Sequence, residues 1–232
     1  MRLKFTLLLL GCLPFLAFSQ KKSSFDVLAG IEYSSISLDD SYSWRKVKDS
    51  GKMNWRFGFN YNRKLTNNFF LKTGLRLASV GYNGQKHTYK WPSEFDSIGN
   101  WVPDPTLIHR WQHIYDFWYL DIPIAGRFEF GGKKLTPFIE AGVSPHIYLY
   151  TKEKTINDFE TTVDNKSGDD FEDIRNIQLV GSFSIGINYK AGKKTQLFFQ
   201  PIFRYHLTKL INYEYEDHLF NYGVEFGIRK QL

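Results

Sequence analysis

Side chains along most of this chain alternate between apolar and polar at every second residue, and this pattern constrains the fold more than any other feature. Successive side chains of an extended strand point to opposite faces, so a period of two residues indicates a sheet with one apolar and one polar face. One segment pairs an apolar face of Met53, Trp55, Phe57, Phe59 and Tyr61 with a polar face of Asn54, Arg56, Gly58, Asn60 and Asn62. Similar alternation predicts eight strands, near residues 26–33, 53–62, 69–77, 120–130, 139–149, 177–190, 197–207 and 220–229.

The segments between these strands alternate between long and short. The expected connections are residues 39–51, 65–68, 83–114, 131–134, 151–176, 191–194 and 209–218. The short ones contain the Asn and Gly residues that tight hairpin turns require. Short turns at one end and long loops at the other are typical of outer-membrane barrels, in which the turns are periplasmic and the loops extracellular. The sequence therefore predicts an all-β fold, a single closed antiparallel transmembrane β-barrel of eight strands.

The same alternation would also suit a soluble ligand-binding barrel of the lipocalin type, with its apolar face turned inward. Two features favour the membrane alternative. The polar face carries many Gly and Ser besides its charges, which suits a crowded interior, and the apolar face is rich in Phe, Tyr, Leu and Ile, which suits lipid bordered by aromatic girdles. A helical membrane protein is not expected, because no stretch after Gln20 approaches the roughly 18 apolar residues that a transmembrane helix requires.

The N-terminus reads as an export signal, with Arg2 and Lys4 preceding the apolar run from Phe5 to Phe18. Small residues in Ala17-Phe18-Ser19 predict cleavage before Gln20, which gives a signal peptide at 1–19 and an outer-membrane barrel domain at 20–232. A lipoprotein signal ending at Cys12 is the alternative, but the apolar run continues beyond that residue. Cys12 is the chain's one cysteine, so the mature part has neither a disulfide nor a thiolate site.

Charged residues on the polar strand faces are expected to fill the lumen. An eight-stranded barrel is only just wide enough for its own side chains, and buried charges are costly unless they are paired. Acids and bases are nearly balanced, which favours an ion-paired plug over an arginine-lined ion path. The expected network comprises Glu32, Arg56, Lys72, Arg76, Asp121, Arg127, Glu129, Glu140, Arg204, Glu225 and Arg229, with Asp26 and Lys190 also turned inward.

Several segments resemble the small outer-membrane barrels of Bacteroidota, the porin-family or PorT-family proteins. Tyr119-Leu120-Asp121-Ile122-Pro123-Ile124 resembles their strand signature YLEIP, with Asp in place of Glu. Pro137 to Gly142, Gly181 to Tyr189 and Phe203 to Thr208 resemble later strands, although His206 and Leu207 depart from the usual RYSYGLT pattern. These motifs are structural, so the resemblance implies an architecture and an outer-membrane location. One member class is linked to type IX secretion, which this sequence does not specifically match.

The second long connection is the best candidate for recognition. Its tryptophans Trp91, Trp101 and Trp111 occur among further aromatic residues and three prolines, a composition too aromatic for a disordered segment. Flat aromatic rings can stack on sugars or anchor a protein partner. Packing of these rings on one another and on the barrel rim is the alternative explanation.

No recognisable catalytic or metal motif appears in the sequence. His109 and His113 have the spacing of two ligands on one helical face, but they lack a protease-type Glu and fall in an expected loop. His146 and His206 are expected to be hydrogen-bonded members of the polar lumen. The acidic stretch at 158–173 could hold calcium through its carboxylates or simply be solvated. A rim site could be built from His87, Ser93, Asp96, His109 and His113, but nothing orders these residues, so we expect no enzyme and no cofactor.

These observations predict a non-enzymatic outer-membrane protein with a structural or surface-interaction role. The alternatives are an accessory subunit of a secretion or transport complex, and a narrow porin of low conductance. Expected partners are outer-membrane lipid and a protein of the cell envelope. The net charge of +6 is too mild and too scattered to indicate nucleic acid.

Overall fold

A computed structural model of the protein describes residues 23–37, 50–158, 160–166, 174–210 and 218–232, without the side chains at 37, 89–94, 101 and 103–109. The expected signal peptide lies outside these residues. In the described part, no helix has the length and apolar character needed to cross a membrane. The regular elements are the strands β1 (Ser23–Ser37), β2 (Ser50–Lys64), β3 (Phe69–Asn83), β4 (His87–Phe95), β5 (Trp101–Asp121), β6 (Ile124–Glu129), β7 (Leu135–Asn157), β8 (Thr161–Lys166), β9 (Ile177–Lys190), β10 (Thr195–His206) and β11 (His218–Gln231).

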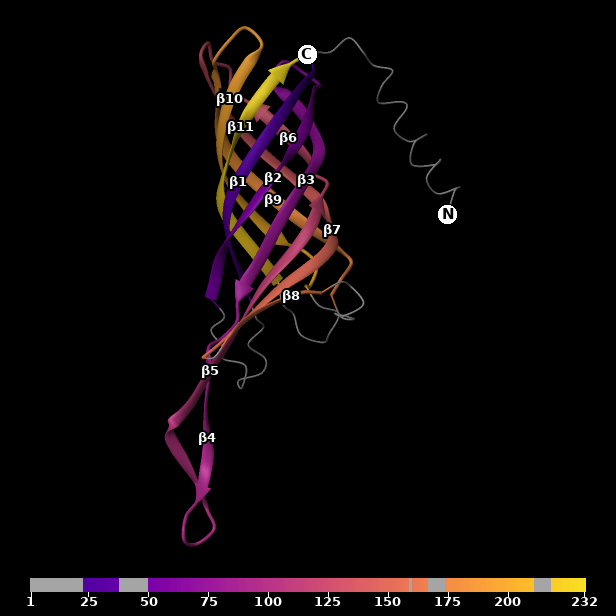
Figure 1. Ribbon diagram of the computed structural model, residues 1–232. Coiled ribbons are helices and arrows are strands. Elements are labelled where there is room, and N and C mark those ends of the chain that lie inside the picture. The colour runs from indigo at the N-terminus through magenta and orange to yellow at the C-terminus, as the bar shows by residue number, and fades with distance from the viewer. Residues whose placement is uncertain (1–22, 38–49, 159, 167–173, 211–217) are drawn as a thin grey trace, which may run out of the picture.

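Eight strand positions form a closed ring, as the sequence predicted (Figure 1). The order around the ring is β1, β2, β3, β5 with β6, β7, β9, β10 and β11, and β11 pairs back onto β1 from Ser37↔His218 to Ser24↔Gln231. β5 and β6 occupy a single position, because both pair with β3 on one side and with β7 on the other. All neighbours are antiparallel. Closure leaves no unpaired strand edge in the barrel wall, which is what a lipid environment requires.

The fourth ring position is interrupted at Ile122 and Pro123, within a stretch that the sequence predicted as one strand. Proline has no N–H to donate to a neighbouring strand, so the ladder breaks there. The preceding residue still contacts β7, since the Ile122 N–H donates to the Pro145 carbonyl at 3.1 Å. Alternate side chains point into the barrel both before and after the break, since Asp121 and Arg127 are both buried inside it.

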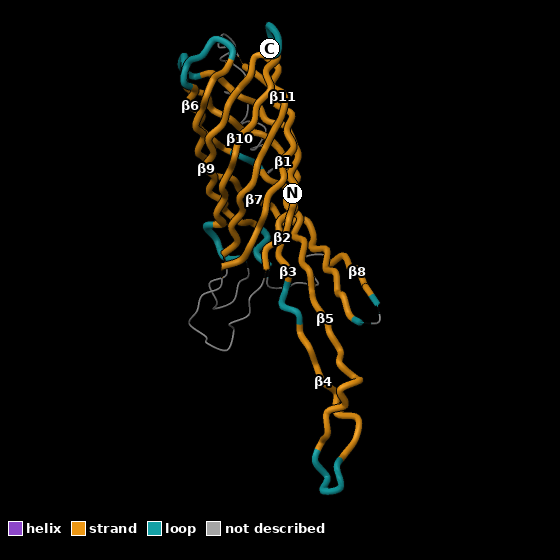
Figure 2. The backbone as a smooth tube through the Cα atoms, turned by 90° about the vertical axis from the view of Figure 1, so that its left-hand side faces the viewer, coloured by secondary structure: helices purple, strands orange, loops and turns teal. Residues whose placement is uncertain are grey.

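The two ends of the barrel differ. The turn end carries the short connections at 65–68, 130–134 and 191–194 together with the start of β1 and the C-terminus, where the Leu232 N–H donates to the Ser23 carbonyl at 3.0 Å. From the opposite, loop end, β4 and the first half of β5 project away as a long hairpin, and β8 pairs with the extended end of β7 (Figures 1 and 2). We call this sheet of β4, β5, β7 and β8 beyond the barrel the extension.

Much of the extension was expected to be loop, and that expectation was wrong. Residues 83–114 contain β4 and the first two-thirds of β5, and residues 151–176 contain the end of β7 and all of β8. The pairs Trp111↔Asn157 and Thr151↔Lys166 show that strand pairing simply continues past the barrel. Prolines hid this continuation in the sequence, because Pro92 and Pro103 disturb the alternation and lie at register shifts of the hairpin.

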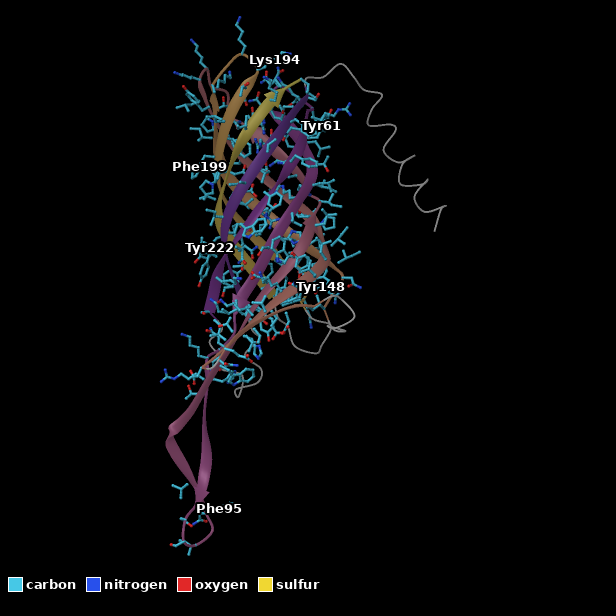
Figure 3. All side chains as sticks on the ribbon, viewed as in Figure 1. Tyr61, Phe95, Tyr148, Lys194, Phe199 and Tyr222 are labelled. Carbon is cyan, nitrogen blue, oxygen red and sulfur yellow. The ribbon has the colours of Figure 1, made fainter. Side chains whose placement is uncertain are left out.

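The outer surface of the ring is apolar on every side. Side chains such as Phe199 and Tyr222 point away from the wall (Figure 3), and both are about half exposed. The opposite faces turn charged and amide side chains into the lumen, where they are buried. This is the arrangement of a transmembrane barrel and the reverse of a lipocalin. The exposed apolar residues include Val27, Ile31, Phe57, Phe59, Leu75, Ile124, Phe128, Ile139, Val143, Phe183, Ile185, Leu197, Phe203, Phe226 and Ile228.

Candidate functional site

The middle of the lumen holds a cluster of arginines and carboxylates from strands on opposite sides of the barrel. Glu32 on β1 accepts from Arg56 Nε at 3.0 Å and also from Arg204 on β10. Arg204 donates in addition to Glu225, and Arg56 donates to Asp121. Each of these groups is at most 2% exposed. Pairs that reach across the lumen in this way fill its middle with buried side chains.

A second set of ion pairs lies nearer the turn end. Glu140 accepts from Lys72 and, at 2.7 Å, from Arg127 Nε. Arg229 holds both oxygens of Asp26 at 2.8 and 3.1 Å. Such bidentate pairs are strong and geometrically specific. All the residues expected in the lumen network form at least one ion pair there, and the network's remaining pairs are Arg76 with Asp121 and with Glu225, and Arg229 with Glu129.

Lys190 departs from the expected arrangement. It lies on the inward face of β9, but at the turn end, where it is exposed and its Nζ donates to the Gly132 carbonyl at 3.3 Å. Without it, acids and bases in the lumen network are equal in number. Burial of paired, neutralised charge is far less costly than burial of an excess of one sign.

A layer of buried polar side chains separates the ion pairs from the loop end. Gln178 donates to the Tyr119 hydroxyl at 3.0 Å and its carbonyl oxygen lies 2.5 Å from His206 Nδ1. His146 packs against His206 with ring centroids 5.3 Å apart, and its Nε2 lies 3.5 Å from Asp121. Both histidines are fully buried in the polar lumen, where the sequence placed them. Of the two, His206 forms the expected hydrogen bond, whereas neither ring nitrogen of His146 has a hydrogen-bond partner among the described residues.

Above this layer, apolar side chains close the lumen toward the loop end. Two of them belong to segments expected as loops: Ile174, and Leu210, whose carbonyl accepts from the Arg175 N–H at 3.1 Å. These connections therefore fold over the mouth of the barrel. We call the cluster the apolar cap; it consists of Val80, Phe117, Tyr119, Tyr148, Ile174, Leu210 and Leu219.

Sequence reasoning missed the apolar residues inside the lumen. Besides the cap, Leu28, Phe138 and Phe198 form a small buried cluster among the ion pairs. The Arg127 guanidinium carbon lies 3.9 Å from the centroid of the Phe138 ring, a cation–π contact. Alternation could have found this cluster, because Phe138 and Phe198 each lie between two polar inward-facing residues, and Leu28 lies two residues after the inward-facing Asp26.

The inward face of β5 continues beyond the cap as a row of aromatic side chains on the extension. Tyr115 stacks on Phe117 of the cap, with centroids 6.2 Å apart, and Trp111 meets His113 edge to face at 4.4 Å. We call the set the aromatic row; it consists of His87, Trp111, His113, Tyr115 and Tyr82. All five are partly exposed. Aromatic rings that leave a closed core and remain accessible are suited to stacking on a ligand.

Polar groups on β7 border this row. His113 Nδ1 lies 2.7 Å from a Glu153 carboxylate oxygen and 3.0 Å from the Thr155 hydroxyl. Glu153 itself is buried, whereas Thr155 is partly exposed. The aromatic row is therefore held in place by hydrogen bonds as well as by ring contacts.

The three tryptophans expected to act in recognition are not gathered at one place. Trp111 lies at the base of the hairpin, between His87 and His113. Trp101 pairs with Phe95 near the hairpin tip, where Figure 3 labels Phe95. The side chains of Trp91 and Trp101 lie outside the described part of the structure, so their predicted role stays a prediction.

The described residues contain no group of three or more side chains suited to hold a metal ion. His109 and His113 lie on a strand instead of in a loop. Four residues of strand span about 13 Å, which is too far for two ligands of one ion. In the acidic stretch, Asp158 accepts from the Arg110 N–H at 2.7 Å and Asp164 lies in β8. Asp169, Asp170, Glu172 and Asp173 lie outside the described residues.

Comparisons with known proteins agree with this architecture. A family model described as "Outer membrane protein beta-barrel domain" matches residues 18–212. Solved structures of similar fold include Neisserial surface protein A (10% identity, 90% of this chain and 97% of that one, TM-score 0.45). Another is the outer membrane protein OprG from Pseudomonas aeruginosa (11% identity, 91% of this chain and 97% of that one, TM-score 0.41). A third is the outer membrane enzyme PagL (12% identity, 87% of this chain and 97% of that one, TM-score 0.41). No curated protein matches this chain.

A closed ring with an apolar outer wall and a charged interior defines a transmembrane β-barrel of the bacterial outer membrane. The family match covers most of the chain, and the chain belongs to the family of outer membrane protein β-barrel domains. The protein accordingly resides in the outer membrane. A closer relation to the Bacteroidota porin-family or PorT-family barrels remains a resemblance of its strand motifs.

Proposed function

We propose that this protein is a non-enzymatic surface-interaction protein, in which a plugged barrel anchors the extension outside the cell. The observation that carries the proposal is the aromatic row, which leaves the sealed lumen and continues, partly exposed, along the extension. The turn end is assigned to the periplasm and the loop end to the exterior, since outer-membrane barrels have short periplasmic turns and longer extracellular loops.

The contents of the lumen argue against a transport role. Ion pairs, the layer around His146 and His206, and the apolar cap follow one another along the barrel. A narrow porin would require an uninterrupted water path, which these buried layers oppose. The side chains in the lumen stabilise the barrel, and specific binding of a partner falls to the exposed extension.

The extension carries one cluster whose residue types resemble a catalytic triad, but its geometry does not support an enzyme. Thr155, His113 and Glu153 resemble a hydroxyl, imidazole and carboxylate triad in composition. Both contacts, however, fall on the same imidazole atom, Nδ1 of His113. A triad needs the hydroxyl on one ring nitrogen and the carboxylate on the other, so that a proton can pass through the imidazole.

Orientation is tested by labelling single cysteines on whole cells with a membrane-impermeant maleimide. A cysteine at Ser97, near the hairpin tip, should react, whereas one at Asn67, in a short turn, should react only after the outer membrane is opened. Labelling of intact cells at Asn67 alone would invert the assignment. Because Cys12 lies in the expected signal peptide, the mature protein should carry no competing thiol.

Recognition is tested with whole cells that display the protein, applied to a printed glycan array and to a panel of immobilised extracellular proteins. Deletion of residues 88–110 or Trp111→Ala should abolish whatever binding is seen. Trp118→Ala is the matched control, since Trp118 lies on the other face of the same strand and packs against Tyr150 and Trp55. Undiminished binding after the deletion would refute the proposal. A stoichiometric envelope partner that co-purifies even without the hairpin would instead favour an accessory subunit of a secretion or transport complex.

A further inference from the structure

A polar cavity of about 240 Å³ opens at the turn end, opposite the extension. Its inner side is formed by Arg229 and Glu129, which are joined at 2.8 Å and lead directly into the ion pairs of the lumen. A molecule that enters here can go no deeper, so the cavity is a pocket and not the mouth of a channel. We call it the turn-end vestibule; its lining includes Ser23, Ser24, Lys64, Asn67, Asn68, Glu129, Lys190, Gln196 and Arg229.

Positive charge dominates this vestibule. Lys64, Lys190 and Arg229 line it from three different strands, against the single carboxylate of Glu129. That carboxylate already accepts from Arg229 and, at 2.9 Å, from Asn188. Among the described residues, neither lysine has a carboxylate partner. The two ammonium groups are therefore available to an incoming anion.

Gln196 provides a second, independent indication of a ligand. Its side chain lines the vestibule and is 8% exposed, yet its carbonyl oxygen Oε1 has no hydrogen-bond partner in the described structure. A buried acceptor without a donor is costly. A ligand that brings an N–H group beside its negative charge would satisfy this atom.

We propose that the turn-end vestibule binds a carboxylate-bearing peptide segment, with its carboxylate against Lys64 and Lys190 and a peptide N–H donated to Gln196 Oε1. Inorganic phosphate has no N–H and can offer Gln196 only the O–H of its protonated forms, so it serves as the competing ligand in the test below. Lipid headgroups lie outside the barrel, whereas Lys64 and Lys190 belong to the inward faces of their strands. The volume suits a few residues of peptide and excludes a folded domain.

In the periplasm such carboxylates have two sources, the stem peptides of the cell wall and acidic segments of periplasmic proteins. The probes are therefore purified soluble muropeptides and the linear peptide Ala-Glu-Ala with a free C-terminus, each titrated by calorimetry into the protein purified from outer membranes in detergent micelles. Acetylated and amidated Ala-Gln-Ala, which carries no charge, and inorganic phosphate complete the set. Preference for one of the two carboxylate probes identifies the source.

We expect saturable binding of at least one carboxylate probe. The double variant Lys64→Ala and Lys190→Ala should weaken it about tenfold, as the loss of a charge-assisted contact predicts. Gln196→Leu should weaken the peptide without affecting phosphate. The matched control, Lys193→Ala with Lys194→Ala, removes two exposed lysines from the adjacent turn (Figure 3) and should leave the affinity within about twofold.

Three results would overturn the proposal: no saturable binding of either carboxylate probe, equal weakening by both lysine pairs, or phosphate binding as tight as that of the peptides. Heat-dependent migration in detergent gels verifies that each variant is folded. The site is independent of the extension, so a protein lacking residues 88–110 should bind the probes normally. Failure of recognition at the extension and failure of the vestibule can therefore be told apart.

Discussion

Glu32 is the carboxylate on which the centre of the lumen depends. It accepts from Arg56 and Arg204, and from the Asn221 amide at 3.2 Å, while being 2% exposed. Its removal would leave two arginines with only their second partners, Asp121 and Glu225. A charge that loses its partner in a buried site destabilises a protein far more than the intact pair stabilises it.

We therefore expect Glu32→Gln to lower the free energy of unfolding by about 3–5 kcal/mol. Glu129→Gln is the comparison, since Glu129 is paired with Arg229 at the more accessible turn end, with its side chain 15% exposed. Glu129→Gln should lower the free energy of unfolding by only about 1 kcal/mol. Urea titration in micelles, followed by tryptophan fluorescence, measures both. Equal costs would show that burial does not govern the strength of these pairs.

Facing at single residues was predictable from the sequence, but packing was not. Alternation correctly assigned Arg127 and Glu140 to one face, because a strand allows only two directions for a side chain. It could not say that Arg127 would stack on Phe138, or that Phe138 would fit against Gly186. A Cβ at Gly186 would lie 2.3 Å from that ring, so only glycine leaves room. Such contacts depend on strand register, which alternation does not specify.

Among elements, the hairpin of β4 and β5 shows where pattern reading failed. The barrel strands were found because one face meets lipid and the other a polar lumen, which imposes strict alternation. A two-stranded ribbon beyond the barrel has no such constraint, and its strands contain Pro92, Pro103 and Pro105. Prolines also blunt exposed strand edges against unwanted pairing. The sequence pattern therefore predicts a loop for this segment, although its backbone forms a paired two-stranded sheet.

The turn at the tip of this hairpin is organised by Asp96. Its carboxylate oxygen Oδ1 accepts from the backbone N–H groups of Asn100 and Ile98 at 2.8 and 2.9 Å, and Gly99 adopts a φ of +84°. These hydrogen bonds, chiefly that from Asn100, hold the pKa of Asp96 below its ordinary value. A carboxyl whose pKa is lowered by folding stabilises the folded turn above its ordinary pKa, and this contribution is lost as pH falls through the lowered value.

Order at the tip should accordingly be retained at neutral pH and should decline as the pH falls below the ordinary aspartate pKa of about 4. Backbone NMR signals of Gly99 and Asn100 report this directly. Asp96→Asn should remove the pH dependence, because its amide oxygen still accepts but no longer titrates. Gly99→Ala should loosen the turn at every pH, since alanine rarely adopts this φ. A pH profile unchanged in Asp96→Asn would assign the transition to another group.

At the scale of the whole molecule, closure of the lumen results from layers in series. The sequence predicted the ion-paired layer from balanced charge and narrow diameter. It did not reveal the apolar cap, because Ile174 and Leu210 come from connections whose positions depend on the closed barrel. The lumen is therefore obstructed by two layers of different chemistry, the ion pairs and the apolar cap. Either layer alone is a barrier to ions.

Conductance in planar bilayers tests this arrangement. The wild-type protein should give only rare, small events. Thinning the cap by Phe117→Ala with Leu219→Ala should change little, because the ion pairs beneath still fill the barrel. Removal of the pair by Arg127→Ala with Glu140→Ala should also change little, because the cap remains.

Only the combination of all four substitutions should produce frequent openings, since a path blocked twice conducts only when both barriers are weakened. Frequent stable openings of the wild type, or of the cap variant alone, would show that the lumen is a pore and not a plug.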